Sequence, residues 1–210
     1  MLSPKVHNFV SYFGSLCVAL CCSPSITPCL VLWVFHFLRR TLETLYLFKF
    51  DPSATVPLAD SIQEFAYYYG FGLWIAGRTS DVNTTNLTWA FILGAWIGCE
   101  YCNFVCHRTL AGLKRRKDGK KTRPEGNVLF SRSSCPHYFF EISSWFLFNF
   151  LTGFTLPGCL FMSVGAIIMT CWAVKRHEGY GDDEEGKQTP LFPFVDLRPP
   201  RILVDALAKA

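Results

Sequence analysis

Apolar runs separated by short polar links dominate the pattern of the chain. The runs cover residues 9–22, 30–38 with a mixed continuation to 50, 61–76, 89–105, 138–154 and 157–174. A membrane-crossing helix needs about 20 mainly apolar residues, and most of these runs approach that length. The pattern therefore predicts an all-α integral membrane domain of about six apolar helices.

Proline residues divide the first apolar stretch. Pro24 and Pro28 stand between the run at 9–22 and the run that begins at Leu30. Proline inside a helix removes a hydrogen bond and clashes with the preceding turn. One long broken span and two separate helices both fit this pattern, and we favour two helices.

The segment that follows the second run carries charges in an apolar setting. Arg39, Arg40 and Glu43 lie in the mixed continuation that ends near Phe50. Ionised side chains are costly to place in an apolar environment unless they are paired. We therefore expect these charges to face water or other polar groups.

Composition supports the membrane interpretation and bears on metal binding. Half of the residues are apolar and only 17% are charged, against about 25% in ordinary soluble domains. Nine of the ten cysteines lie in apolar runs, where cysteine behaves as a small hydrophobe. Cys99, Cys102, Cys106 and His107 have a helical spacing that suits a metal, but a structural site needs further ligands elsewhere. The prediction is that no metal is bound.

Basic residues are concentrated in one loop and predict the topology. Between Arg108 and Arg132 there are nine Lys or Arg residues against two acids. The positive-inside rule places segments 39–58, 108–137 and the residues after 174 in the cytosol. The same orientation puts the glycosylation sequons at Asn83 and Asn86 in a lumen, and whether they are glycosylated stays open.

Polar side chains mark two helical faces on either side of this loop. Asn103 and His107 are four residues apart, and Tyr138 and Glu141 are three apart, so each pair shares a face. Asn103 and His107 could serve only as hydrogen bonds between helices. A carboxylate inside a span costs about 2.5–3.5 kcal/mol at the helix centre and usually faces a partner or a wet cavity. The basic loop is either a topology signal, an anionic-lipid surface or a clamp for phosphates.

Nucleotide-binding motifs of the common kinds are missing from the sequence. Neither a P-loop nor a Gly-x-Gly-x-x-Gly phosphate cradle occurs. A bound nucleotide would therefore be held by another arrangement, and no nucleic acid partner is expected.

A series of motifs occurs in one order between about residue 30 and residue 180. The most specific block reads Ser-Cys-Pro-His-Tyr-Phe-Phe-Glu at 134–141. The others are His-Phe-Leu-Arg-Arg-Thr-Leu-Glu at 36–43, Thr-Val-Pro-Leu at 55–58, Tyr-Tyr-Tyr-Gly-Phe at 67–71 and the pair Asn103 and His107. This series resembles the steroid 5α-reductase family, in its branch of trans-2-enoyl-CoA reductases of very-long-chain fatty acid elongation.

The resemblance implies an NADPH-dependent enzyme of the endoplasmic reticulum membrane, with several spans and an active site that faces the cytosol. It would saturate the 2,3 double bond of a long-chain trans-2-enoyl-CoA, among membrane lipids and beside other elongation enzymes. By the same resemblance Tyr138 is the proton donor. The implied cofactor contacts are Arg40, Asn103, His107, Lys114, Glu141, His177 and Tyr180.

Three departures from the family pattern leave alternatives open. The family carries an amino-terminal ubiquitin-like region and a first span with a functionally important Glu, for which the residues before Phe9 offer no match. An acidic stretch at 181–188 replaces the family's carboxyl-terminal pattern, and Lys114 stands where Arg is common. We expect a membrane domain at 1–180 and a polar tail at 181–210. The alternatives are a steroid or polyprenol reductase of the same family and a catalytically silent, partner-binding membrane protein.

Overall fold

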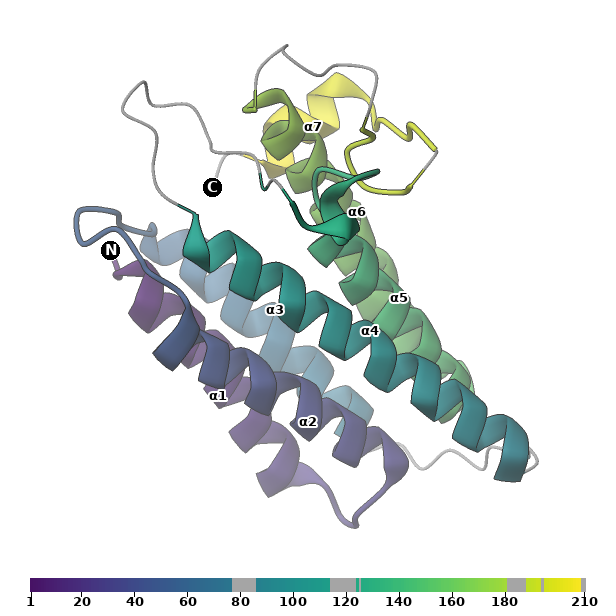
Figure 1. The fold of residues 1–210 in the computed structure, drawn as a ribbon. Helices are drawn as coiled ribbons and strands as arrows, with labels where there is room; N and C mark the ends of the chain where they lie inside the picture. Colours follow the sequence, from purple (N-terminus) through teal and green to yellow (C-terminus); the bar gives the residue numbers. More distant parts are fainter. Residues whose placement is uncertain (77–85, 114–123, 125, 181–187, 194, 209–210) are drawn as a thin grey trace. The chain divides into compact units, whose positions relative to one another are not determined.

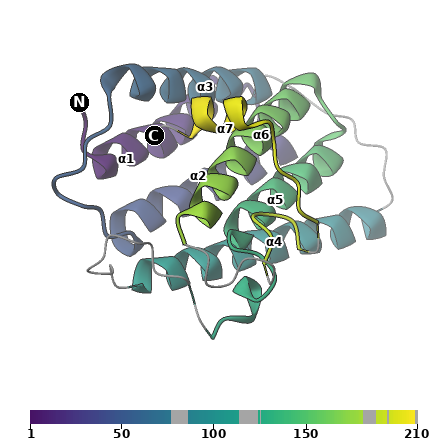
Figure 2. The same ribbon diagram turned by 90° about the horizontal axis from the view of Figure 1, so that it is seen from above.

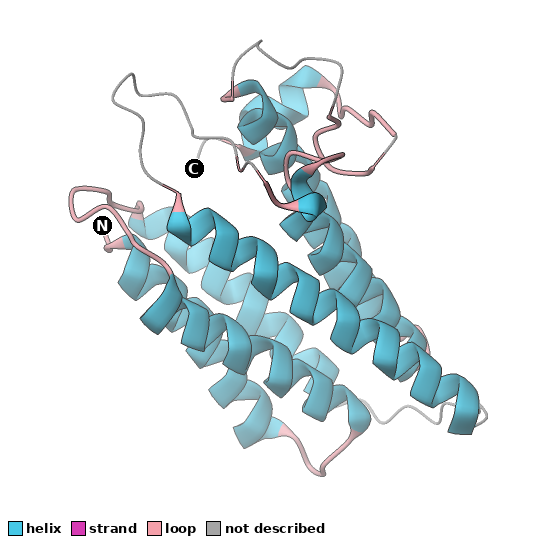
Figure 3. Ribbon diagram, in the orientation of Figure 1, coloured by secondary structure: helices cyan, strands magenta, loops and turns pink. Residues whose placement is uncertain are grey.

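The computed structural model describes residues 1–76, 86–113, 124, 126–180, 188–193 and 195–208. Every named element within these residues is a helix (Figure 3), and Figure 1 follows the helices along the chain. The chain divides into two compact units. The first unit comprises Met1–Gly94 with Phe146–Phe161, and the second comprises Ala95–Trp145 with Met162–Ala210.

The proline-divided stretch at the start of the first unit forms two helices, as predicted. Helix α1 covers Pro4–Cys22 and helix α2 covers Pro28–Leu42. Each begins with a proline, whose missing N–H costs nothing in the first turn. Ser3 and Thr27 cap these helices by accepting hydrogen bonds from backbone N–H groups. A π-helix, η1 (Glu43–Leu47), continues from α2, and α3 covers Leu58–Ala76.

Small side chains on one face of α1 let the neighbouring helices approach closely. Ser11, Ser15 and Ala19 are four residues apart and completely buried, a pattern that favours close helix packing in membranes. The Trp33 indole of α2 donates to Ser15 Oγ over 3.2 Å, and the Tyr69 hydroxyl of α3 donates to the carbonyl of Val10 over 2.6 Å. Figures 1 and 2 show α1, α2 and α3 side by side.

Aromatic rings fill the core of the first unit. The Trp33 ring packs against Phe37 at 4.7 Å and Phe161 at 5.0 Å between ring centroids. Phe161 belongs to α6 (Leu156–Glu178), which follows α5 (Pro136–Thr152) after a short turn. Gly153 in that turn has φ 76°, a left-handed conformation that glycine adopts without strain and that ends helices.

Helices α4 (Asn86–Gly112), α5 and α6 are each divided between the two units, and the second unit contains their parts within 95–145 and 162–210. It also contains the 3₁₀ helix η2 (Val128–Phe130) and α7 (Arg201–Leu207). Buried Val204 of α7 packs with Cys171 and Val174 of α6. The indole of Trp172 donates to the carbonyl of Leu207 over 3.1 Å. The predicted tail thus contains a helix that the sequence pattern did not indicate. Residues 181–187 of the acidic stretch lie outside the described residues.

Two helices, α4 and α6, are long and apolar enough to cross a membrane. The other predicted runs are also helical, and their crossing of a membrane stays a prediction. All ten cysteines are free thiols, and Cys29, Cys106 and Cys171 are buried as expected of packing residues. Cys21 and Cys22, at the end of α1, are exposed, so the predicted packing role does not hold for them.

Candidate functional site

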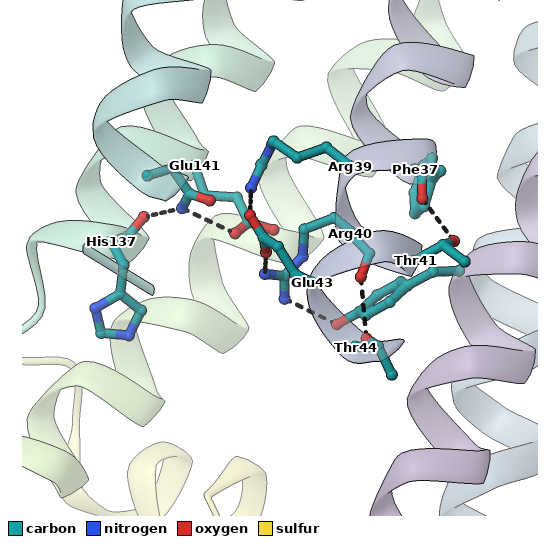
Figure 4. Close-up of polar contacts among 10 residues, drawn as sticks. Phe37, Arg39, Arg40, Thr41, Glu43, Thr44, His137 and Glu141 are labelled. Atoms are coloured by element: carbon teal, nitrogen blue, oxygen red, sulfur yellow. Dashed lines mark hydrogen bonds and ion pairs between the residues drawn. The ribbon is translucent and has the colours of Figure 1, made fainter. Parts of the chain in front are cut away.

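Asn103 of α4 and Glu141 of α5 meet in the second unit. The Asn103 Nδ2 donates to the His137 carbonyl over 2.7 Å and to Glu141 Oε2 over 3.3 Å. Figure 4 labels the two acceptor residues, His137 and Glu141. A backbone carbonyl can only accept a hydrogen bond, so it sets which end of the amide faces it. Asn103 is completely buried. The polar faces of α4 and α5 that the sequence indicated are therefore joined here.

The other end of the Asn103 amide is a buried acceptor without a hydrogen bond. Among the described residues, no donor reaches its Oδ1 atom. Leaving a buried acceptor unsatisfied costs about 1–3 kcal/mol. An N–H or O–H group of a bound molecule would remove that cost, so the residues present fit a ligand that carries such a donor.

Tyr138 stands in the first turn of α5, three residues before Glu141. Its ring packs against His137 at 4.1 Å and against Trp172 of α6 at 6.1 Å between centroids. The Tyr138 N–H donates to the Cys135 carbonyl over 3.1 Å. The side chain is half-buried, which allows a phenol to be held by packing and still meet a reactant.

His107, His177 and Tyr180 are all buried in the second unit. His107 lies one turn after Asn103, and its ring is 5.7 Å from that of His137. His177 is at the end of α6, where its Nδ1 lies 2.6 Å from Ser134 Oγ. The Tyr180 N–H donates to the His177 carbonyl over 3.1 Å, which turns the chain out of the helix.

Two charged residues of this unit were not identified from the sequence. Arg176 of α6 is close enough to Tyr138 and Tyr180 for its charge to interact with both phenols. The sequence interpretation used it only as a topology signal, although it directly precedes His177. Glu100 is 2% exposed, and it shares the buried face of α4 with Asn103. The spacing of 100, 103 and 107 could have revealed it.

Arg40 belongs to the first unit, where it forms a buried ionic cluster. Its Nη1 is 2.8 Å from Glu43 Oε2, and its Nη2 donates to the Tyr12 hydroxyl over 3.0 Å. Arg39 also pairs with Glu43 (Figure 4), whose side chain is only 2% exposed. The predicted polar setting for these charges is confirmed, since they surround one another.

Some predicted positions lie outside the described residues. Lys114 and Asn83 are among them, while Asn86 is exposed at the first position of α4. Within the described part of the chain, no group of three or more His, Cys, Asp or Glu side chains is arranged to hold a metal ion. The candidate site of the second unit is therefore defined by its amide, carboxylate, phenol and imidazole groups, and Arg40 is described separately as part of the ionic cluster of the first unit.

The chain belongs to the steroid 5α-reductase family. The 3-oxo-5-alpha-steroid 4-dehydrogenase family matches residues 54–190, which is more than half of the chain. The match includes the block from Ser134 to Glu141 and the buried residues His177 and Tyr180. It confirms the resemblance to the steroid 5α-reductase family.

The similar proteins include some named as enoyl-CoA reductases and one named as a steroid 5-alpha-reductase. The chain is similar to the very-long-chain enoyl-CoA reductase of Dictyostelium discoideum, at 33% identity over 79% of this chain and 57% of the relative. It is 31% identical to the human trans-2,3-enoyl-CoA reductase-like protein over 69% of this chain and 42% of the relative. It is 26% identical to the steroid 5-alpha-reductase DET2 of Gossypium hirsutum over 78% of this chain and 67% of the relative. The chain thus spans little more than half the length of the Dictyostelium relative.

Proposed function

We propose that the chain carries the catalytic part of an NADPH-dependent reductase for the 2,3 double bond of trans-2-enoyl-CoA in very-long-chain fatty acid elongation. The observation that carries the proposal is the buried, unsatisfied Oδ1 of Asn103. The amide of this residue contacts Glu141 of α5, the helix that carries Tyr138 in its first turn. The names of the Dictyostelium and human relatives support the substrate class. NADPH, when bound, supplies the hydride.

The acceptor groups and the cations suit different parts of the cofactor. Asn103 Oδ1 and the Glu141 carboxylate accept hydrogen bonds, so they fit the carboxamide N–H₂ of the nicotinamide rather than a phosphate. Arg40 carries a guanidinium that is suited to phosphate oxygens, and Lys114 adds charge. His107, His177 and Tyr180 complete the proposed set of cofactor contacts.

Tyr138 is the proposed proton donor. When a hydride reaches the β-carbon of an enoyl thioester, negative charge develops on the thioester oxygen and the α-carbon. The Tyr138 hydroxyl stabilises this charge and gives its proton to the α-carbon. Arg176 interacts with the Tyr138 phenol, and a cation stabilises the phenolate that remains after proton transfer. Solvent then returns the proton.

The proposed location is the endoplasmic reticulum membrane, with six spans and the site facing the cytosol. The two apolar helices α4 and α6 and the basic loop at 108–132 support it. Lipid would cover the exposed apolar side chains of these helices. Other elongation enzymes are the proposed protein partners, because the substrate of this reaction is produced by the preceding step of the same cycle.

Steroid reduction is a second candidate, favoured by the cotton relative and by the description of the family. Both reactions add a hydride to a carbon–carbon double bond conjugated to a carbonyl, followed by a proton. The same donor and the same cofactor contacts would serve either substrate. Turnover with a long-chain enoyl-CoA and with a 3-oxo-4-ene steroid, compared in the same preparation, separates the two.

The proposal is tested by NADPH binding to three forms of the purified chain in detergent. The Asn103→Leu variant removes the buried acceptor, and Asn149→Leu removes a second completely buried Asn, whose amide donates to the Gly158 carbonyl. A lost buried hydrogen bond of about 1–3 kcal/mol predicts a Kd for NADPH raised roughly 5- to 150-fold in Asn103→Leu only. Equal affinities in the parent and both variants, at matched thermal stability, would contradict the proposed site.

A further inference from the structure

Helix α7 lies beyond the residues that match the family, but it packs against a helix that lies within them. The match ends at residue 190, whereas α7 covers Arg201–Leu207. Val204 is 1% exposed and packs with Cys171 and Val174 of α6. A helix of seven residues is too short to be stable by itself. The contacts with α6 therefore hold α7 in place.

One hydrogen bond links the end of α7 to Trp172 of α6. The Trp172 Nε1–H donates to the Leu207 carbonyl over 3.1 Å. Leu207 is the last residue of α7, and the last four carbonyl groups of an α-helix have no partner inside it. An indole has one donor and no acceptor, so this carbonyl fixes the direction in which the N–H edge of the ring points. Helix α7 thus orients the Trp172 ring.

The Trp172 ring in turn contacts the ring of Tyr138. The ring centroids are 6.1 Å apart and the ring planes are inclined by 47°. Tyr138 also packs against the neighbouring ring of His137 and against the buried cluster that contains Cys135 and Leu191. Trp172 is therefore one of the side chains that confine the Tyr138 ring, and its own orientation depends on α7. The contacts from α7 through Trp172 to Tyr138 all lie within the second unit.

We propose that α7 is a positioning element of the candidate functional site, which acts through Trp172 to hold the phenol of Tyr138 where it meets a reactant. Its role in the reaction rests on the proposed function of Tyr138 as the proton donor. A displacement of a reacting group by about 1 Å can cost about 100-fold in rate. Loss of α7 frees the indole and lets the Tyr138 ring tilt, so catalysis slows while the cofactor is still bound.

The placement of Tyr138 is followed by fluorine NMR of the full chain that carries fluorotyrosine, with the Tyr138 signal assigned by its loss in Tyr138→Phe. Val204→Ala removes buried carbon atoms from the contact between α7 and α6, and a chain that ends after Pro200 lacks α7. We expect the Tyr138 signal to shift in both. Ile202→Ala is the matched control on α7, because Ile202 is 82% exposed, and it should leave the signal where it is in the parent.

The path through Trp172 is tested by combining two changes. Trp172→Phe keeps an aromatic ring and removes the N–H that reaches α7. Loss of α7 from the Trp172→Phe chain should then move the Tyr138 signal little further, because both changes break the same link. Trp74→Phe, in the first unit, also removes an indole and should leave the signal unchanged.

Two results of the NMR comparison would overturn the proposal. A Tyr138 signal that stays in place when α7 is removed would show that α7 does not position the ring. Equal shifts on removal of α7 with and without Trp172→Phe would exclude the path through Trp172. If the chain that ends after Pro200 does not fold, Val204→Ala, alone and combined with Trp172→Phe, gives the same test. These outcomes do not depend on any enzyme activity.

Turnover of a long-chain trans-2-enoyl-CoA tests the consequence for the reaction. We expect kcat to fall roughly 10- to 100-fold in Trp172→Phe and in the chain that ends after Pro200, with an unchanged Kd for NADPH. An unchanged kcat beside a shifted Tyr138 signal would overturn the role of α7 in the reaction. A parent without turnover, whose Tyr138 signal still depends on α7, would contradict the proposed function and support the link from α7 to Tyr138.

Discussion

Replacing Glu43 with Gln should destabilise the first unit strongly, because it removes a buried negative charge that pairs with both Arg39 and Arg40. The carboxylate is 2% exposed and the two arginine side chains are 13% and 11% exposed. Breaking a buried ion pair on one side costs about 3–5 kcal/mol, and the partial solvation of the arginines favours the lower end. At about 3 kcal/mol, a chain of this size should lose roughly 6–12 °C in Tm.

Thermal unfolding in detergent, followed by a thiol-reactive dye, measures this loss. Exposed Cys21 and Cys22 react at once, and buried Cys29 of the same unit reacts only on unfolding. The control is Asp196→Asn, which breaks the exposed pair with Arg198, whose side chains are about half exposed. Such surface pairs contribute about 0–1 kcal/mol. Equal Tm values for the Glu43 and Asp196 variants would refute the reasoning.

Three further predictions concern packing, cofactor binding and topology. In Gly14→Ala the new Cβ would lie 2.1 Å from the Tyr69 hydroxyl, whereas Gly70 has open space around it. We expect Gly14→Ala to lower the free energy of unfolding by about 1–3 kcal/mol and Gly70→Ala to leave it almost unchanged, as measured by thermal unfolding. Lys114→Glu should weaken NADPH binding in a titration while protein abundance stays unchanged, because it places like charge near phosphate, and an unchanged Kd would remove Lys114 from the site. Protease protection of tagged loops should place the sequons at 83–88 in the lumen and the loop at 108–137 in the cytosol, and the reverse result would overturn the orientation.

Helices of the chain are predictable because their signals are local. The proline at the start of α1 and α2, and the length of each apolar run, depend on neighbouring residues only. Helix α7 has no such signal. It covers only seven residues, Arg201–Leu207, and Val204 is buried by α6, which is distant in sequence. Tertiary packing supplies the stability that such a short helix lacks by itself.

Residue types at the candidate site were predictable in part. The spacing of Asn103 and His107 and of Tyr138 and Glu141 indicated shared faces. The contact between Asn103 and Glu141 bridges 38 positions of sequence, so no local pattern could show it. The unsatisfied Oδ1 of Asn103 also emerges only from the set of partners around it.

Buried charge was the feature that local reasoning handled least well. Glu43 is the first residue of the π-helix η1 and pairs with Arg39 and Arg40, which stand four and three residues before it. π-helical turns are rare insertions that often occur at functional sites. Arg176 was interpreted as a topology signal because a cation after an apolar run usually is one. Its interaction with the phenol of Tyr138 depends on the packing of α5 and α6.

Turnover of a long-chain trans-2-enoyl-CoA with NADPH, compared between the parent chain and its Tyr138→Phe variant, tests the central proposal most directly. The variant keeps the ring and its packing against His137 and Trp172 and loses only the hydroxyl. Tyr101→Phe, on the exposed face of α4, is the matched control. NADPH oxidation and the saturated acyl-CoA are measured together, at equal Tm. The account predicts a rate about 100- to 10,000-fold lower in Tyr138→Phe, with NADPH binding retained, and a Tyr101 variant as active as the parent. A Tyr138→Phe variant as active as the parent would contradict the proton-donor role, and a parent that forms no saturated product would contradict the proposed activity.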